Sequence, residues 1–418
     1  MKNVILFGIG KYVDIIESLL QEDVHVLFYM DNDKQKQTVL RNGKKIYAIK
    51  EMPEISFDYI IISAFSYKKI EFQLIKNGFK KEQIIAFFGE NIPFGEYDAI
   101  LNPLKSIQYS LECRLEYNIR QLEYKYELLC ENTVFEMADM IRKESVKLPQ
   151  ICTVEETCKK IIEDKVSLSR YGDGEFQIIL GAAKDVYQDD DERLGERLKE
   201  ILISNYEKHI VALADDYGCM EGIREENKDS IRKYMTREKR RQHYQYIDMN
   251  KKYYNAYVSR PYVIYPHNER EQACNRFKEL KKIWNGQKVI LVEGEYTRMG
   301  IGNDLFENAK SIERIIAPNK NAFSVYDKLF EAVLRVNKDR LILIALGPTA
   351  TVLAYDLARK GYWAIDIGHL DLEYEWYLKG EGYSQIPNKY NNEVLGGTVV
   401  EEIEDEDYNK SIIDVVGI

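Results

Sequence analysis

The sequence predicts an α/β protein in which two domains, each built on a parallel sheet, are joined by a long helix. Short apolar runs alternate with amphipathic helical patterns in residues 1–92 and again in residues 151–378. This alternation is typical of parallel sheets with right-handed crossovers. Residues 93–150 instead carry one long apolar periodicity, which predicts a helical linker. A chain of 418 residues is too long for one typical core, so two or three domains are expected.

Composition excludes several classes of protein. Hydrophobic residues make up 45% and charged residues 31% of the chain, as in soluble globular proteins. A net charge of -10 argues against a nucleic-acid binder, which usually needs a basic face for backbone phosphates. The apolar run at the N-terminus is too short to span a membrane and is interrupted by Asp14 and Glu17. We therefore expect a cytoplasmic protein without a transmembrane segment, whose scattered cysteines are reduced thiols.

Residues 1–92 predict a Rossmann-like domain. The runs "NVILFGIG", "VHVLFYMDND" and "DYIIISAF" have the character of buried strands, and helical patterns separate them. Gly8 and Gly10 open a G-x-G turn, and Asp31 lies where a dinucleotide fold places its ribose-binding acid. The third glycine of that fingerprint is replaced by Val13, so NAD binding is not expected. The domain is either a nucleotide or nucleotide-sugar pocket or a structural or regulatory module.

Residues 93–150 predict one long amphipathic helix. After Pro103, apolar residues recur at three- and four-residue steps. They are Leu104, Ile107, Leu111, Leu115, Ile119, Leu122, Tyr126 and Leu129. Two interpretations remain open: a linker helix packed on its own domains, or a homo-oligomer formed through residues 104–129.

Residues 151–378 predict the larger α/β domain. A capping box, Thr153 with Glu156, precedes its first helix. Strands at 287–295 and 340–348 each end in a glycine-containing turn followed by a helical pattern, so ligand loops are expected at the carboxyl ends of the strands. Residues 379–418 contain the acidic run "EEIEDEDY" and are expected to form a weakly packed or solvated extension.

The stretch "SRYGDGEFQ" contains the candidate metal ligands. If the chain stays extended beyond the strand, Asp173 and Glu175 project to the same side and can share Mg²⁺ or Mn²⁺. Gly172 would let a bulky anion approach the backbone, and Arg170 would offer it a fork of donors. The alternative is an ordinary Asp-Gly turn with a solvated Glu175.

Two strand-to-helix junctions are candidate phosphate sites, because backbone N–H groups and a helix dipole favour an anion there. The first is "EGEYTRMGIGNDLF" and the second is "ALGPTATVLA". Their candidate substrate-binding residues are Arg298, Gly302, Asn303, Asp304, Pro348 and Thr349. Each junction alone could be an ordinary helix cap.

The segment "AIDIGHLDLEYEWYL" combines a strand with carboxylates and an aromatic residue, which suits sugar hydroxyls and a general base. Asp371 and Glu373 share a face if the chain is extended, whereas in a helix Asp371 would pair with Glu375. His369 could equally be an ordinary loop histidine.

These motifs, in this order, resemble the bacterial glycosyltransferases of the GT-D fold, formerly a domain of unknown function often found in adhesin-glycosylation and surface-polysaccharide loci. The matching pieces span about 168–378 and are "RYGDGEF", "VSRPY", "VEGEYTRMGIGNDLF", "IIAPNKNAF", "ALGPTATVLAYDLA" and "DIGHLDLEYEW". The resemblance implies a GT-D type catalytic domain in which Asp173 and Glu175 bind the metal and the diphosphate of a UDP-sugar. The N-terminal region more weakly resembles Rossmann-like domains fused to sugar-handling enzymes.

The leading hypothesis is a metal-dependent transfer of a hexose from a nucleotide-sugar donor to a protein- or lipid-linked glycan acceptor, in surface glycoprotein or polysaccharide synthesis. Arg298 or Arg260 would assist the metal, and Glu373 would be the base, with Asp371 and His369 positioning sugar hydroxyls. The alternatives are an NAD(P)-linked sugar-nucleotide epimerase or dehydratase and a non-catalytic sugar-nucleotide-binding scaffold. The basic run at 232–244 leaves open a peripheral contact with the inner face of the membrane, although a solvated helix face is more typical.

Overall fold

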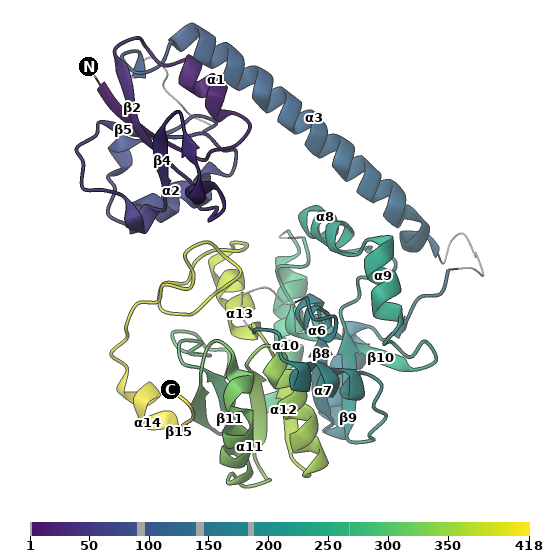
Figure 1. Ribbon diagram of the computed structural model, residues 1–418. Coiled ribbons are helices and arrows are strands. Elements are labelled where there is room, and N and C mark those ends of the chain that lie inside the picture. Colours follow the sequence, from purple (N-terminus) through teal and green to yellow (C-terminus); the bar gives the residue numbers. More distant parts are fainter. Residues whose placement is uncertain (1, 90–96, 139–145, 183–187, 267) are drawn as a thin grey trace. The chain divides into compact units, whose positions relative to one another are not determined.

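The computed structural model describes residues 2–89, 97–138, 146–182, 188–266 and 268–418 (Figure 1). It divides into two compact units, Met1–Tyr126 and Glu127–Ile418, called here the first and the second unit. Both units are α/β, as the alternating pattern predicts. No helix in the described ranges is both long enough and apolar enough to cross a membrane.

The first unit is built on a six-stranded sheet in the order β3-β4-β2-β1-β5-β6, parallel except for the β3–β4 pair. Its strands are β1 (Lys2–Phe7), β2 (Val24–Met30), β3 (Leu40–Arg41), β4 (Lys44–Tyr47), β5 (Tyr59–Ile62) and β6 (Ile84–Ala86), and its short helices are α1 (Val13–Ser18) and α2 (Tyr67–Lys76). Val4 and Leu6 pack in one core while Ile5 and Phe7 pack in another, because successive strand residues point to opposite faces. The sheet is therefore covered on both faces, as expected for a Rossmann-like unit.

Helix α3 (Pro103–Glu136) is an unbroken helix of 34 residues (Figure 1). Ser106, Ser110 and Cys113 are buried on one face, and the ring of Tyr117 on that face stacks on Phe65 with centroids 4.5 Å apart. That face completes the core of the first unit. The predicted apolar face is exposed instead.

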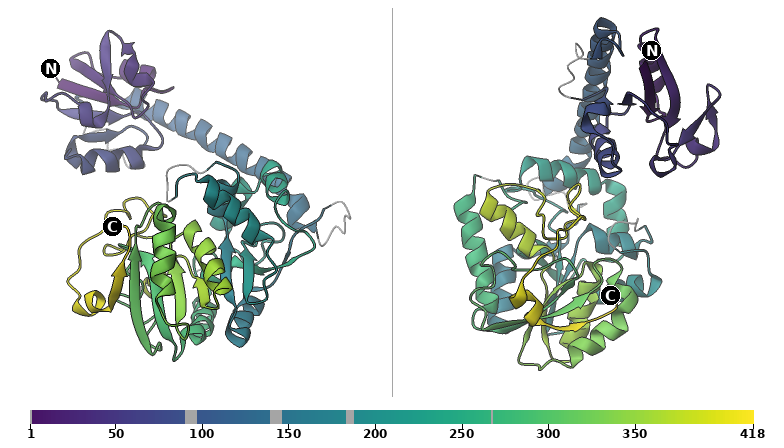
Figure 2. Two further views of the ribbon diagram at one scale, coloured as in Figure 1. Left: turned by 60° about the horizontal axis from the view of Figure 1, so that its bottom comes forward. Right: turned by 90° about the vertical axis from the view of Figure 1, so that its left-hand side faces the viewer.

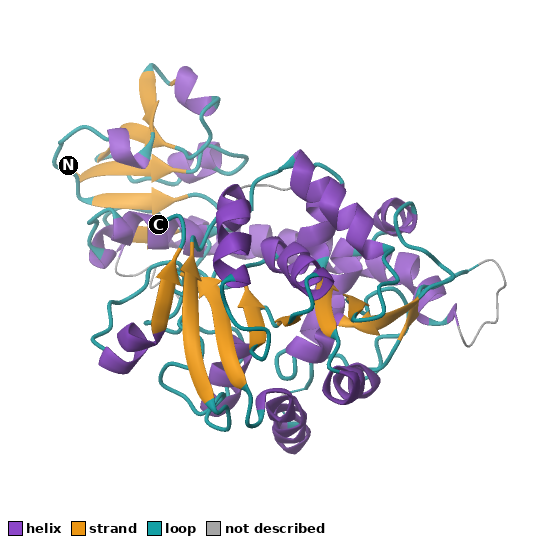
Figure 3. Ribbon diagram, turned by 90° about the horizontal axis from the view of Figure 1, so that it is seen from below, coloured by secondary structure: helices purple, strands orange, loops and turns teal. Residues whose placement is uncertain are grey.

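The second unit is built on a nine-stranded sheet in which every described pair of strands is parallel. Figure 3 shows the strands side by side. The order is β15-β12-β11-β13-β14-β8-β9-β10-β7. The strands are β7 (Gln150–Ile151), β8 (Ser167–Tyr171), β9 (His209–Leu213), β10 (Lys252–Asn255), β11 (Lys288–Gly294), β12 (Ser311–Ala317), β13 (Leu341–Ala345), β14 (Trp363–Asp366) and β15 (Ile412–Val415).

Helices cover both faces of this sheet (Figure 2). They are α5 (Val154–Asp164), α6 (Asp173–Ile179), α7 (Glu192–Leu202), α8 (Glu225–Tyr234), α9 (Arg237–Tyr244), α10 (Arg270–Trp284), α11 (Tyr326–Leu334), α12 (Pro348–Arg359), α13 (Leu370–Lys379) and α14 (Glu406–Ser411). Ile290 and Val292 belong to one core and Val289 and Leu291 to the other, so the centre of β11 is apolar on both faces, as in buried parallel strands. The predicted capping box of Thr153 and Glu156 is confirmed at the start of α5.

Two local predictions for the second unit are wrong. The stretch after β11 forms turns through residue 310, not a helix, so no helix dipole is available at the first predicted phosphate junction. Residues 379–418 are not a solvated tail, because Ile386, Lys389 and Asn391 are buried and β15 pairs with β12. Lys389 pairs with Asp371 and Glu375, and Glu393 pairs with Arg260, whereas the acidic run at 401–407 is largely exposed. A charge count cannot reveal which charges have partners in the fold.

Candidate active site

A cavity of about 320 Å³ opens at the carboxyl edge of the second unit's sheet. Parallel α/β sheets usually bind ligands at this edge, because the loops after the strands meet there. The polar side chains that line it come from the ends of β8, β9 and β10 and from neighbouring segments. They are Arg170, Asp173, Glu175, Asp216, Ser230, Tyr234, Tyr257, Arg260 and Tyr383. Gly172, Gly347 and the mostly apolar Tyr171, Ala214, Ile231, Ala256 and Ile264 complete the lining. The cavity therefore brings together five of the predicted site residues: Arg170, Gly172, Asp173, Glu175 and Arg260.

The local geometry of Asp173 and Glu175 differs from the prediction. Strand β8 ends at Tyr171 and α6 begins at Asp173, so the two carboxylates lie in the first turn of a helix and not on an extended chain. Residues two apart in a helix are separated by roughly 200° of rotation, so they do not project to one side. Glu175 Oε2 turns back to accept a hydrogen bond from Gly172 N at 2.7 Å, while Asp173 stays exposed. Both side chains nevertheless reach the cavity.

Half-buried carboxylates at the cavity and beside it hold their protons more tightly than usual. Burial raises the pKa of Glu175 to about 7. Burial also raises the pKa of Asp216 to about 6, with Asp215 and Asp173 adding repulsion, and burial raises that of Asp215 to about 6. Tyr257 donates its hydroxyl proton to Asp216, and Asn255 Nδ2 donates to Asp215 at 3.1 Å. Negative charge concentrated in this way favours a cationic ligand.

Arg170 is held in place at the cavity by the end of β14. Its Nε donates to the carbonyl of Asp366 at 3.0 Å, and its Nη2 donates to Asp366 Oδ1 at 2.8 Å. Gly368 lies against the guanidinium with φ +47°, and a Cβ at that position would come within 2.9 Å of Arg170 Cζ. The close approach explains why a glycine follows β14.

Arg260 is held by a residue that the sequence analysis did not single out. Glu393 accepts from Arg260 Nη1 at 2.9 Å and from Nη2 at 2.5 Å, and its Oε1 also lies 2.6 Å from His369 Nδ1. Burial alone would raise the pKa of Glu393, but Arg260 and His369 lower it well below its usual range. His369 thus contacts Arg260 only through Glu393 and does not line the cavity.

The position of Glu373 argues against the predicted role as general base. Its side chain is fully buried in α13, where Oε2 accepts from the backbone N–H groups of Tyr262 and Val263 at 3.0 and 2.9 Å. Arg260 Nη1 donates to its other oxygen at 3.3 Å. A base must reach the acceptor hydroxyl, and a carboxylate enclosed by these donors does not. The geometry gives Glu373 the role of holding the loop that carries Arg260.

Asp371 is also a structural carboxylate. Because the segment is helical, Asp371 and Glu375 lie on the same face of α13, as the helical alternative predicts. Asn303 Nδ2 donates to both, at 2.9 and 2.8 Å, and the buried Lys389 Nζ donates to both, at 2.7 and 2.8 Å. This network ties the turns after β11 and the segment beyond α13 to one helix.

The remaining predicted substrate-binding residues lie outside the cavity lining. Arg298 is buried and donates to the carbonyls of Asn388 and Glu401 at 3.0 and 2.7 Å, so its charge is not offered to a phosphate. Asp304 is engaged by Lys281 and Tyr374. The others outside the lining are Gly302, Asn303, Pro348 and Thr349, although Gly347, immediately before Pro348, does line it. Of the two junctions, the second is the one at the cavity.

Several residues of the site were missed in the sequence. Asp216 lines the cavity, and together with Asp215 it comes shortly after β9, which ends at Leu213. Acids that follow a strand are the same signal that singled out Asp173. Tyr257 and Tyr234 reach the cavity from elements without a distinguishing motif. Glu393 carried no signal, since its partners lie 24 and 133 residues away in the chain.

The side chains of the cavity fit a divalent cation in part. Carboxylate oxygens are the ligands that Mg²⁺ and Mn²⁺ prefer, and Mg²⁺ is commonly bound by one or two carboxylates together with substrate phosphates. Among the described residues, no group of three or more Asp, Glu, His or Cys side chains has the arrangement of a complete metal site. The donor set therefore suits a cation that shares its shell with the phosphates of a ligand.

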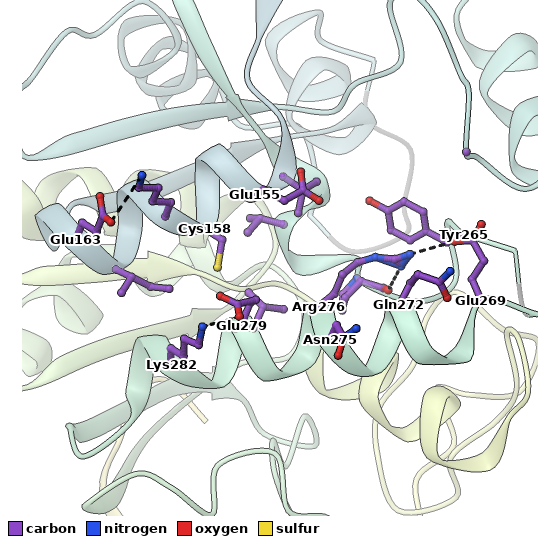
Figure 4. Close-up of a pocket in the computed structure, with 17 residues that line it drawn as sticks. Glu155, Cys158, Glu163, Tyr265, Glu269, Gln272, Asn275, Arg276, Glu279 and Lys282 are labelled. Carbon is purple, nitrogen blue, oxygen red and sulfur yellow. Dashed lines mark hydrogen bonds and ion pairs between the residues drawn. The ribbon is translucent and has the colours of Figure 1, made fainter.

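A larger cavity of about 700 Å³ lies between α5 and α10, away from this chemistry. Figure 4 shows its charged side chains, several of which are already paired with one another. Arg276 lies over the ring of Tyr265 at 3.6 Å and donates to Glu269, and Lys282 pairs with Glu279. The smaller cavity is the better candidate for the active site, because the loops after the parallel strands converge there.

The glycine turn of the first unit donates a hydrogen bond to an acidic residue of the same unit, Asp31. Asp31 is buried at the end of β2, where the Rossmann pattern predicts it, and its Oδ2 accepts from Ile9 N at 2.7 Å. Lys36 Nζ lies 3.0 Å from the same oxygen. The backbone N–H between Gly8 and Gly10 therefore has a partner within the protein.

Both units match known protein families. Residues 168–394 match the family model "Glycosyltransferase GT-D fold", and residues 1–85 match "C2185-like, N-terminal". Over 293 residues the chain is 34% identical to Glycosyltransferase GlyD of Streptococcus pneumoniae serotype 4, covering 68% of this chain and 35% of that protein. Over 269 residues it is 32% identical to the probable glycosyl transferase Gly of Streptococcus gordonii, covering 63% of this chain and 38% of that protein. The chain thus spans little more than a third of the length of either relative.

Solved structures share the fold of the second unit. One, described as the domain of unknown function 1792 with a distinct glycosyltransferase fold, is 35% identical with a TM-score of 0.60 and covers 64% of this chain and 96% of its own. Another, described as a new glycosyltransferase from Streptococcus sanguinis, is 32% identical with a TM-score of 0.60 and covers 65% of this chain and all of its own.

Proposed function

The chain belongs to the GT-D family of glycosyltransferases, and from this premise we propose that it transfers a hexose from a nucleoside-diphosphate sugar, a UDP-sugar, to a glycan acceptor. The observation that carries the proposal is the cavity at the carboxyl edge of the second unit, which combines two guanidinium groups with a cluster of carboxylates. The acceptor would be a protein- or lipid-linked glycan of surface glycoprotein or polysaccharide synthesis. The reaction would take place in the cytoplasm or at the inner face of the membrane.

Arg170 and Arg260 would bind the diphosphate. The bonds of Arg170 to Asp366 use Nε and Nη2, which leaves Nη1 as a donor for an anion. Both guanidinium groups are oriented by carboxylates before any ligand binds, so little side-chain entropy is lost on binding. Preorganised cations of this kind stabilise the charge that develops on a departing diphosphate.

Asp173 and Glu175 would hold Mn²⁺ or Mg²⁺ together with the phosphates. The exposed Asp173 and the free Oε1 of Glu175 support this assignment, since the bond to Gly172 uses only Oε2. A divalent cation bound there supplies Lewis-acid neutralisation of the leaving diphosphate.

Asp216 is our candidate for the group that takes the proton of the acceptor hydroxyl. It lines the cavity, which Glu373 does not, and Tyr257 orients its carboxylate. Burial places its pKa at about 6, closer to neutral pH than an ordinary aspartate, and bases work best near the operating pH.

The test is a screen of UDP-, GDP- and CMP-sugars for nucleotide release with Mn²⁺, measured with and without EDTA. We expect Mn²⁺-dependent release from a UDP-sugar, and an Asp216→Asn variant that loses about 10²-fold or more in turnover while its affinity for UDP is retained. Glu279→Gln in the larger cavity is the matched control and should keep full activity. Full turnover of Asp216→Asn would remove it as the base.

The same measurements separate the two alternatives. A non-catalytic scaffold would bind a nucleotide sugar in calorimetry without releasing nucleotide. An NAD(P)-linked epimerase would need a cofactor at the glycine turn of the first unit, where Asp31 already accepts the N–H of Ile9.

A further inference from the structure

The apolar face of α3 is exposed along almost its whole length. Its members are Leu104 (81% exposed), Leu111 (61%), Leu115 (63%), Leu122 (66%) and Tyr126 (68%), together with Ile107, Ile119 and Leu129 at 39–47%. We call these eight residues the α3 stripe. At 100° per residue they fall within a sector roughly 120° wide, running about 39 Å along the helix. Contiguous apolar surface of this extent marks an interaction site on a soluble protein.

The first unit cannot cover the stripe, because it already packs against the other side of the same helix. Ser106, Ser110 and Cys113 are 0–6% exposed and lie roughly 180–240° around the helix from Leu104. Cys113 is part of the core of the first unit. The helix is thus anchored by one face and presents the opposite one.

Part of the α3 stripe repeats every eleven residues. "LKSIQYSLECR" at 104–114 is followed by "LEYNIRQLEYK" at 115–125, so Leu104 aligns with Leu115 and Leu111 with Leu122. Eleven residues make three helical turns at 3.67 residues per turn, close to the natural 3.6. Two such helices can pack side by side with little supercoiling, which explains why the heptad register in this segment is weak.

Charged residues follow the same repeat on the two edges of the α3 stripe. Glu112 and Glu123 lie at one edge, roughly 80–100° from the stripe centre, and Arg114 and Lys125 lie at the other, roughly 60–80° from it. Lys105, near the start of the helix, is a basic residue on the acidic edge. When two parallel helices are related by a twofold axis along their length, the acidic edge of each meets the basic edge of the other. In an antiparallel pair, acid would meet acid.

From this pattern we propose that two copies of the chain pair through the α3 stripe as a parallel, in-register helix dimer. Glu112 then lies opposite Arg114 of the second copy and Glu123 opposite its Lys125, each offset along the axis by two residues, or about 3 Å. Glu112 also accepts from Gln108 and Arg114 also donates to Gly89 O at 3.4 Å, contacts that leave further oxygens and donors for the pair. This pairing is independent of the proposed transferase activity.

The mass of the full chain in solution tests the pairing, by light scattering and sedimentation velocity without any donor present. We expect twice the 49.1 kDa chain mass for the wild type and a monomer for the double variant Leu115→Glu, Leu122→Glu. Tyr124→Glu is the matched control, because Tyr124 is 42% exposed on the opposite face of α3. A monomeric wild type, or a control that dissociates as the stripe variant does, would overturn the proposal.

Disulfide cross-linking tests the orientation. In a chain with the exposed Cys130 and Cys219 replaced by serine, Leu104→Cys and Leu122→Cys should each cross-link to the same residue of the second copy. These positions lie about 27 Å apart along α3, so both can do so only in a parallel, in-register pair. Cross-linking at one position alone would indicate an antiparallel pair and contradict the proposal.

The charged edges give a compensation test. Reversing the basic edge with Arg114→Glu and Lys125→Glu should raise the dissociation constant of the dimer about 10-fold or more, since two acidic edges then meet. Adding Glu112→Lys and Glu123→Lys restores complementarity and should restore the affinity. If the four-residue variant stays as weak as the two-residue variant, the parallel arrangement is wrong.

Discussion

At the scale of single residues, the carboxylates of the second unit lie in two different environments. Asp173 and Asp216 line a cavity, whereas Asp371 and Glu373 in a similarly acidic segment are enclosed by donors of their own chain. Buried carboxylates cost several kcal/mol unless such donors surround them. The residue type is the same in both cases, and only the partners separate an acid that lines the cavity from a structural one.

Asp173 should be required for metal-linked stabilisation of the protein. We expect Mn²⁺ with UDP to raise the melting temperature of the wild type, because a ligand at 100 times its dissociation constant adds about 2.7 kcal/mol. Asp173→Asn should remove the part of this shift that depends on Mn²⁺, while Glu279→Gln should keep it. An unchanged Mn²⁺ effect in Asp173→Asn, measured by differential scanning fluorimetry, would exclude Asp173 as a ligand.

His209 should make the second unit less stable in acid. Ser169 donates to the carbonyl of Thr351, so His209 Nε2–H donates to Ser169 Oγ at 2.7 Å, and Nδ1 is buried without a hydrogen-bond partner. Burial lowers the pKa of His209 to about 3, below its unfolded value of 6.5. The unfolded chain therefore binds more protons between these values, and stability present above pH 6.5 is lost as the pH falls.

The measurement is urea unfolding followed by tryptophan fluorescence, since all three tryptophans lie in the second unit. Between pH 8 and pH 5 the wild type should lose about 2 kcal/mol more than His209→Gln, whose amide can still donate to Ser169 but does not titrate. Equal losses in the two proteins would show that His209 is not responsible.

At the scale of elements, the loops after the parallel strands place the site, and glycines decide how closely they approach one another. Gly368, after β14, lies on the guanidinium that β8 presents at the cavity. Gly347, after β13, has φ +54° and ψ −141°, a conformation open to glycine and little else. Close contact between the loops holds Arg170 in one orientation.

Gly368→Ala should displace Arg170 and weaken donor binding about 10-fold or more, with the fold retained. Gly361→Ala is the control, because Gly361 also has positive φ, at +84°, but a Cβ there would meet only Lys338 Nζ, at 3.7 Å. Isothermal titration with UDP and Mn²⁺ measures both variants. If Gly368→Ala and Gly361→Ala lose the same affinity for UDP, backbone strain at a positive φ, and not the position of Arg170, explains the loss.

At the scale of the whole molecule, the chain combines two parallel-sheet units of different character. The second unit has its cavity at the carboxyl edge of the sheet. The first unit has the strand order and the acid of a dinucleotide fold, but the acid accepts the N–H of the glycine turn. The two units therefore share an architecture but differ in what lies at the carboxyl edge of the sheet.

NAD(H) should not bind to the first unit more tightly than the millimolar range, about 4 kcal/mol. A pyrophosphate at the glycine turn would have to displace Asp31 from Ile9 N, and Val13 stands where close approach needs glycine. Calorimetric titration of the full chain with NAD(H) is the measurement. Micromolar affinity would revive the epimerase alternative.

The sequence by itself determined the class of fold, because strand and helix periodicities are local and survive without knowledge of contacts. It gave both parallel sheets, the long helix and the capping box at Thr153, and it identified Arg170, Asp173, Glu175 and Arg260 as residues of one site. Asp173 and Glu175 stand beside glycines just after β8, so their signal lies in their immediate neighbours.

Only the tertiary structure decided which of the other charged residues line the cavity. Arg298 and Glu373 have the same local pattern as the true lining residues, yet their partners, Asn388 and Tyr262, lie 90 and 111 residues away. Glu393 orients Arg260 from a segment that composition assigned to a solvated tail. The free energy of a buried charge depends on the donors around it, and those donors are brought together by the fold and not by spacing along the chain.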